Sequence, residues 1–172
     1  MKNDLSNRAI KALAGSAAIA AFAWVSAAAS PAYSATLSRS MDVRGMPAAV
    51  WSVIGPFCAI KDWLPPVGTC VEDGKTPPTR TLVTKDGKAT FVETQVARSE
   101  ASHRYSYTFK SSPLPVLRYV STIEVTDKGN GVSTVTWSAE YAPAEGKETE
   151  AATALSGIYE SGLAEIKARF PG

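Results

Sequence analysis

The sequence predicts an α+β protein made of one curved antiparallel sheet of seven strands and a long C-terminal helix. Strand-like segments follow one another through the middle of the chain, and their connections are too short for helical crossovers, so neighbouring strands must run antiparallel. The last part of the chain repeats its apolar residues at helical spacing instead. A curved sheet whose concave face is covered by that helix satisfies this order and leaves room for an internal cavity.

The first elements of this fold are one strand and two short helices. Residues 36–43 alternate between apolar and polar side chains, as a half-buried strand does. A proline at position 47 is tolerated at the first helical position and begins a short helix over 47–54, which a Gly-Pro pair ends. A second short helix is expected over 57–62, because two prolines after it force the chain to extend.

The rest of the chain provides six further strands and the long helix. The turn signals Asp86-Gly87 and Gly129-Asn130-Gly131 mark two hairpins. The strands are expected over 67–73, 79–84, 89–99, 103–110, 116–127 and 132–142. The helix is expected over 147–170, with its apolar side formed by Leu155, Ile158, Tyr159, Gly162, Leu163, Ile166 and Phe170.

The first 34 residues have the layout of an export signal. Three basic residues precede an apolar run of small residues over 12–29. Small residues after this run favour cleavage after Ser34, with Ala35 as the second choice. An uncleaved anchor is the alternative, because the run approaches the roughly 20 residues that span a bilayer. We predict a signal peptide over 1–34, a domain over 35–172 and a periplasmic or secreted location, with no membrane attachment after cleavage.

The predicted mature domain is formally neutral. The removed segment holds three basic residues and one acidic residue, which accounts for the whole net charge of +2. The 138 remaining residues of the 172 fit one domain. A neutral domain without a basic cluster argues against nucleic acid as a partner and is consistent with binding something mostly apolar.

The two cysteines, Cys58 and Cys70, are expected to form a disulfide. In an oxidising compartment an even pair at short separation is more often bonded than free, and the bond would contribute about 3 kcal/mol to stability. A metal pair and a catalytic thiol are the alternatives. The domain has a single histidine, His103, which cannot supply a metal cluster and has no visible reason to sit beside either cysteine. We therefore predict no metal and no cofactor.

Several segments, taken in order, make the chain similar to a known superfamily. They are residues 51–65, Thr79-Arg80-Thr-Leu, Asp86-Gly87, Val92-Glu93-Thr, Tyr105-Ser-Tyr107, residues 114–121 and Gly162-Leu163. With this spacing the chain resembles the SRPBCC or START-like superfamily of birch-pollen-allergen-like proteins, in particular its polyketide cyclase/dehydrase and lipid-transport group. The resemblance implies a helix-grip fold over the mature chain. The similarity is greatest to exported MxaD-like bacterial proteins and, more distantly, to plant abscisic acid receptors.

This resemblance implies a set of ligand-binding residues on the concave face of the sheet. Glu93 stands where the receptors have a pocket glutamate, Tyr119 and Ser121 match pocket-lining residues, and Arg80 matches a nearby strand arginine. Strand alternation and the helix pattern add further candidates. These are Phe91, Tyr105, Tyr107 and Phe109 on the strands, with Ile158 and Gly162 on the helix.

Two departures from these relatives limit the chemistry. The tight Asp86-Gly87 turn replaces the mobile gate of the receptors, so gating of the hormone type is not expected. Leu64 stands where related exported proteins often have a histidine, which removes a candidate general acid or base. Three interpretations of Glu93 stay open: an ion pair with Arg80, a ligand anchor together with a cavity tyrosine, and a general base.

The sequence thus predicts an exported, non-enzymatic binding or accessory protein for a small apolar or amphipathic ligand. The MxaD-like resemblance implies a partner among periplasmic redox proteins, a methanol dehydrogenase or its cytochrome. One alternative is a cyclase or dehydratase that uses Glu93 with Tyr107 or Tyr119. The other is an interaction protein whose cavity is filled by side chains. A cavity of roughly 300 Å³ or more that contains Glu93 would favour binding or catalysis.

Overall fold

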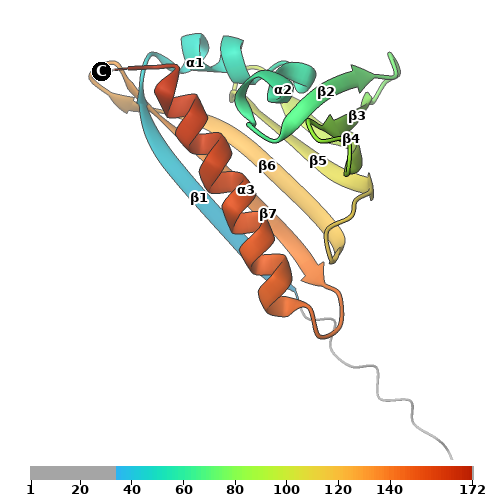
Figure 1. The fold of residues 1–172 in the computed structure, drawn as a ribbon. Helices are drawn as coiled ribbons and strands as arrows, with labels where there is room; N and C mark the ends of the chain where they lie inside the picture. The colour runs from blue at the N-terminus through green and yellow to red at the C-terminus, as the bar shows by residue number, and fades with distance from the viewer. Residues whose placement is uncertain (1–33, 172) are drawn as a thin grey trace, which may run out of the picture. The chain divides into compact units, whose positions relative to one another are not determined.

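A computed structural model describes residues 34–171 of the protein and confirms the predicted α+β architecture. The predicted export signal lies outside the described residues, apart from Ser34. The elements run in the predicted order along the chain (Figure 1). They are β1 (Ala35–Arg44), α1 (Pro47–Ile54), the 3₁₀ turn η1 (Phe57–Ala59), α2 (Ile60–Trp63), β2 (Val67–Glu72), β3 (Thr79–Thr84), β4 (Thr90–Ser99), β5 (Arg104–Ser111), β6 (Val116–Gly129), β7 (Val132–Pro143) and α3 (Glu148–Ala168).

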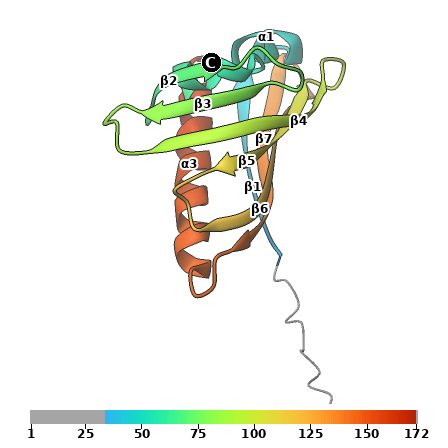
Figure 2. The same cartoon turned by 90° about the vertical axis from the view of Figure 1, so that its right-hand side faces the viewer.

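All seven strands form one antiparallel sheet in the order β1-β7-β6-β5-β4-β3-β2. Every strand from β2 to β7 pairs with its neighbour in sequence, and β1 pairs with β7 at the far edge. The sheet curves around α3, which lies along β1 and β7, while α1 and α2 lie at one end of the sheet (Figures 1 and 2). This is the helix-grip arrangement, and its core lies between α3 and the concave face.

The helix α3 packs on the sheet through one side. Its buried residues repeat at helical spacing: Ala151, Leu155, Tyr159, Gly162, Leu163 and Ile166. The absence of a side chain at Gly162 is required, since a Cβ there would lie 2.8 Å from Cζ3 of Trp137 and 3.1 Å from Leu64. The helix therefore approaches the rings of the sheet at this position more closely than any other residue would allow.

The strand β6 contains an irregularity at its start that the sequence pattern does not predict. The register with β7 shifts between Leu117 and Val120, and Arg118 adopts a left-handed backbone with φ of 46°. The shift leaves Leu117 exposed and turns Tyr119 inward, so that Tyr119 and the alternate residues after it are buried. A bulge therefore determines which residues of β6 reach the concave face.

The region between β1 and β3 confirms the predicted disulfide and shows one difference in helical structure. Cys58 in η1 and Cys70 in β2 are bonded, which ties the short helices to the edge strand. The segment expected as one helix over 57–62 is divided into η1 and α2. No helix of the described residues is long and apolar enough to cross a membrane, and the same residues contain no cluster of metal-ligating side chains.

Candidate functional site

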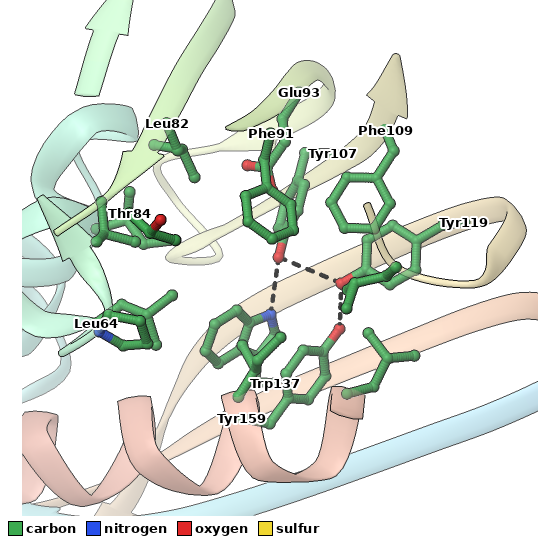
Figure 3. A pocket seen from close by; sticks show the side chains of 16 residues that line it. Leu64, Leu82, Thr84, Phe91, Glu93, Tyr107, Phe109, Tyr119, Trp137 and Tyr159 are labelled. Atoms are coloured by element: carbon green, nitrogen blue, oxygen red, sulfur yellow. Dashed lines mark hydrogen bonds between the residues drawn. The ribbon is translucent and has the colours of Figure 1, made fainter. Parts of the chain in front are cut away.

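A cavity of about 100 Å³ lies between the concave face of the sheet and α3 (Figure 3). Most of its walls are aliphatic or aromatic, and Glu93 is its one charged residue. Three tyrosines contribute hydroxyl groups. The lining consists of Ile60, Leu64, Pro66, Val67, Leu82, Thr84, Phe91, Glu93, Tyr107, Phe109, Leu114, Tyr119, Trp137, Leu155, Ile158 and Tyr159.

Six of the ten predicted ligand-binding residues line this cavity: Phe91, Glu93, Tyr107, Phe109, Tyr119 and Ile158. The other four lie beside it. Arg80 and Tyr105 are buried behind the wall, and Ser121 is buried under Tyr159, to whose hydroxyl it is hydrogen-bonded. Gly162 faces the rings of Trp137 and Trp63. Strand alternation therefore predicts which residues lie on the concave face of the sheet, but it does not distinguish those that line the cavity from those buried behind its wall.

The cavity is smaller than the sequence-based expectation for a binding or catalytic site. Its volume of about 100 Å³ lies below the roughly 300 Å³ at the lower end of common ligand pockets. Large side chains fill the remaining space. The rings of Phe109 and Tyr119 stack with centroids 4.0 Å apart, and those of Trp137 and Tyr159 stack at 4.2 Å. The space left between these aromatic walls suits a molecule of only a few non-hydrogen atoms.

The charged end of the cavity is an ion pair between neighbouring strands. Arg80 of β3 and Glu93 of β4 stand opposite each other in the strand register. Arg80 Nε donates to Glu93 Oε2 at 2.6 Å, and the two side chains are 0% and 5% exposed. Arg80 Nη1 also donates to the backbone carbonyl of Phe57, and its guanidinium carbon lies 4.0 Å from the centre of the Phe57 ring. The η1 turn and the strand partner thus fix Arg80 from two sides.

Burial and pairing act in opposite directions on these two groups. The pKa of the Glu93 carboxyl is raised overall, because the effect of burial outweighs the charge of Arg80 and its hydrogen bond, which oppose the rise. Burial lowers the pKa of Arg80, but Glu93 and the nearby tyrosines more than offset this effect, so the pKa is raised overall. Arg80 therefore stays charged, and its charge and hydrogen bond favour the ionised form of Glu93 against the effect of burial.

A chain of hydroxyl groups forms the second polar cluster beside the cavity, and Figure 3 shows its members Tyr107, Tyr119 and Tyr159 with Trp137. Tyr119 Oη lies 2.6 Å from Tyr159 Oη, which lies 2.8 Å from Ser121 Oγ. Trp137 Nε1 donates to Ser121 Oγ at 2.9 Å and to Tyr107 Oη at 3.2 Å. Tyr107 and Ser121 are cross-strand neighbours on β5 and β6, while Tyr159 reaches the chain from α3. The network therefore connects the helix to three strands.

Burial keeps the tyrosines of this network protonated. It is the largest cause of the raised pKa of Tyr107, of Tyr119 and of Tyr159. Neighbouring tyrosines add to the rise for Tyr107 and Tyr119. At neutral pH these side chains can donate and accept hydrogen bonds but cannot act as bases.

Sequence reasoning missed ten of the lining residues, most of them aliphatic or aromatic. Trp137 and Tyr159 matter most, because they provide a stacked wall and two of the polar groups of the network. A signal for Tyr159 was present, since it follows Ile158 on the apolar side of the last helix. Leu114 and the residues of α2 and β2 come from loop and edge positions, where strand alternation provides no signal.

Comparisons with known proteins agree with this architecture. The family model described as "Polyketide cyclase / dehydrase and lipid transport" matches residues 34–171. The protein XoxI from Bacillus cereus is 32% identical, with a TM-score of 0.74 over 79% of this chain and 95% of that one. An uncharacterised protein from Bacillus thuringiensis is 31% identical, with a TM-score of 0.74 over 79% of this chain and 98% of its own.

A more distant structure shares the fold alone. The Zhui aromatase/cyclase from Streptomyces sp. R1128 is 14% identical, with a TM-score of 0.64 over 80% of this chain and 93% of the enzyme. A comparison with curated protein sequences finds no significant match. Since the family model covers the whole described domain, the chain belongs to the polyketide cyclase/dehydrase and lipid-transport family of the SRPBCC superfamily.

Proposed function

We propose that the domain is a non-enzymatic binding protein that holds one small apolar or amphipathic molecule between the sheet and α3. The cavity carries this proposal, because apolar walls surround one carboxylate and a few hydroxyl groups. Sites of this composition bind through apolar contact and orient the ligand through their few polar groups. The volume of about 100 Å³ is below the roughly 150 Å³ of a cavity known to hold benzene, so the ligand is small.

The polar groups favour binding over catalysis. A general base needs a free acceptor whose pKa lies near the working pH. Arg80, which is bonded to Glu93 Oε2 at 2.6 Å, stabilises the ionised carboxylate and so weakens it as a base, and the raised pKa values of Tyr107 and Tyr119 keep both hydroxyls protonated. The cyclase or dehydratase hypothesis requires Glu93 or one of these tyrosines to accept a proton. Fixed, fully protonated or paired groups are better suited to orienting a ligand.

Nuclear magnetic resonance tests the binding proposal directly. Titration of the purified protein with 1-butanol and 1-methoxypropane should shift the amide resonances of β4, β5 and α3 in a saturable way. A ligand of this size is held by at most about 1.5 kcal/mol per non-hydrogen atom, so dissociation constants in the micromolar to millimolar range are expected.

A matched pair of variants shows whether the cavity is the binding site. Ile158→Trp places a large side chain in the cavity and should abolish the shifts, while Val96→Trp adds the same side chain at a position that is 53% exposed and outside the lining. Equal binding by both variants would place the ligand elsewhere. Failure of every probe to bind the unaltered protein would overturn the binding proposal in favour of an interaction role.

We further propose that the chain is exported and cleaved after Ser34. The charged start, the apolar run and the small residues before Ala35 support this, and the Cys58–Cys70 disulfide is consistent with an oxidising compartment. Expression of the full chain in a Gram-negative host should yield a periplasmic protein whose intact mass corresponds to a chain that begins at Ala35. A cytoplasmic or full-length product would contradict this proposal.

The partner in that compartment is proposed to be a redox protein. The support is the resemblance to MxaD-like proteins, which are encoded beside methanol dehydrogenase in methylotrophs. Affinity capture from a periplasmic extract of the source bacterium should recover a dehydrogenase or a cytochrome. If neither is recovered, and neither gene lies nearby, the partner proposal is wrong, while the binding proposal remains.

A further inference from the structure

The donors and acceptors in the hydroxyl chain beside the cavity can be assigned, because one hydroxyl must donate its proton to a backbone carbonyl. Ser121 Oγ lies 2.9 Å from the backbone carbonyl of Ser138, and a carbonyl only accepts. The single proton of Ser121 is therefore used there. The Ser121 oxygen also accepts from Trp137 Nε1 at 2.9 Å, since an indole nitrogen only donates. Every other hydroxyl bond in the chain must be consistent with these two assignments.

The remaining directions follow one at a time. Tyr159 must donate to Ser121 at 2.8 Å, because the proton of Ser121 is already used. Tyr119 must then donate to Tyr159 at 2.6 Å for the same reason. Each proton thus points away from Tyr107 and toward the carbonyl of Ser138. Ser121 is saturated by one donated and two accepted bonds, which explains why this predicted ligand residue is not available to a ligand.

Tyr107 is the free end of the chain. The proton of Tyr119 is already used, so Tyr107 would have to donate to Tyr119, and their oxygens are 3.5 Å apart. This separation exceeds the 2.5–3.0 Å of a normal O–H···O bond. The Tyr107 hydroxyl accepts from Trp137 at 3.2 Å, and its own proton is left with the long contact to Tyr119. Tyr107 therefore offers the cavity a hydrogen-bond donor.

Glu93 offers the same cavity an acceptor. Arg80 binds Oε2, and no described residue donates to the second oxygen, Oε1, in the structure. Arg80 contacts both residues, because its Nε is bonded to Glu93 and its guanidinium carbon is 5.0 Å from the centre of the Tyr107 ring, and the charge of Glu93 adds to the raised pKa of Tyr107. Both residues line the cavity. A ligand group between them has to accept one hydrogen bond and donate another.

We propose that the ligand is a small apolar alcohol whose hydroxyl accepts from Tyr107 and donates to Glu93. This inference rests on the proposed binding function and names its ligand class. A carboxylate ligand would place a second negative charge beside Glu93, and an ether would leave the Glu93 oxygen without a donor. An ammonium group could donate to Glu93 but could not accept from Tyr107. A hydroxyl group satisfies both residues.

Isomeric probes test this inference apart from the binding proposal. The probes 1-butanol and 1-methoxypropane have the same atoms, but only the alcohol can donate a hydrogen bond. Butyrate and butylammonium complete the series. In titrations followed by amide chemical shifts, the alcohol should bind about tenfold more tightly than the ether, because an unpaired buried acceptor costs about that factor. Butyrate should bind most weakly.

Two tyrosine variants show whether the Tyr107 hydroxyl donates to the probe. Tyr107→Phe should weaken the binding of the alcohol and of the ether by about threefold to tenfold, because the oxygen of either probe accepts from Tyr107. Tyr105→Phe removes a buried hydroxyl outside the cavity lining and should leave both affinities unchanged. Both variants retain the side chains of Arg80 and Glu93.

Three outcomes separate the two proposals. A preference for the alcohol in the unaltered protein, together with weaker binding in Tyr107→Phe but not in Tyr105→Phe, supports the inference. Equal binding of alcohol and ether by the unaltered protein overturns the inference while the binding proposal stands. Binding of none of the four probes overturns the binding proposal and the inference with it.

Discussion

The two polar clusters beside the cavity differ in how they satisfy buried groups. Arg80 and Glu93 balance opposite charges across β3 and β4, whereas Tyr119, Tyr159 and Ser121 form a neutral chain between the sheet and α3. Removing one member of an ion pair leaves a buried charge, whereas removing one hydroxyl leaves at most an unpaired dipole. The charged cluster therefore tolerates change less well at neutral pH, and the neutral cluster becomes vulnerable where its hydroxyls ionise.

The largest expected effect is the response of the neutral cluster to alkaline pH. Burial raises the pKa of Tyr107, Tyr119 and Tyr159 in the hydroxyl chain, and of Tyr105 outside it, above the ordinary value of 10.0. The folded state then binds more protons than the unfolded state, so the stability from these groups is complete below about pH 10 and falls as the pH rises further. Above that pH, each of these tyrosines lowers the free energy of unfolding by up to about 1.4 kcal/mol per pH unit.

Two optical signals check this expectation. Tyrosinate absorbance at about 295 nm and the far-ultraviolet circular dichroism should change together in one cooperative step above about pH 10. Gradual ionisation of these tyrosines in a protein that keeps its circular dichroism would show that they are accessible and would contradict the prediction.

The ion pair should give the largest effect of any single substitution at neutral pH. In Arg80→Met, Glu93 stays buried but loses its ion-pair partner. The free energy of unfolding should therefore fall by about 3–5 kcal/mol in denaturant titrations. The double variant Arg80→Met with Glu93→Leu removes both charges and should recover most of the loss. A double variant that is as unstable as the single one would mean that packing, and not charge balance, sets the cost.

Loss of the disulfide should weaken the support of the charged cluster. The Cys58–Cys70 bond holds η1, whose Phe57 carbonyl and ring contact Arg80. Replacing both cysteines with serine should lower the free energy of unfolding by about 3 kcal/mol. Reduction of the unaltered protein should give the same loss in the same denaturant titration, and a stability that does not depend on reductant would contradict this prediction.

The smallest losses of stability are expected for substitutions at two positions of the hydroxyl chain. Tyr159→Phe removes one bond to Ser121 and one to Tyr119, so the free energy of unfolding should fall by about 1–3 kcal/mol. Tyr107→Phe removes a hydroxyl whose bond to Tyr119 is 3.5 Å long, so the loss should be at most about 1 kcal/mol. Equal losses in denaturant titrations would contradict the direction assigned to the chain.

The order of elements could be predicted because it depends on local patterns. Strand alternation and the Asp86-Gly87 turn locate the hairpins, and Gly87 adopts the expected left-handed backbone with φ of 69°. The pairing of Arg80 with Glu93 was one of three open interpretations, and the strand register brings the two side chains together. Local sequence carries this information because neighbouring strands in this fold are neighbours in sequence.

The shape of the cavity could not be predicted, because it depends on packing between distant segments. Tyr159 reaches the site through the rotation of α3 about its own axis, and Leu114 comes from a loop. The resemblance places Ser121 at the ligand, but its bonds to Ser138, Trp137 and Tyr159 are already complete. These features depend on the arrangement of side chains from four elements, which no single segment encodes.

Gly162 sets the distance between α3 and the aromatic side chains of the sheet. Its α-carbon lies against the indole of Trp137 with no room for a methyl group, so the residue sets the clearance between α3 and the sheet. An alanine at this position would act as a spacer that lifts the helix away from the aromatic wall. Because Trp137 lines the cavity, a substitution at position 162 would change the cavity without altering a residue of either polar cluster.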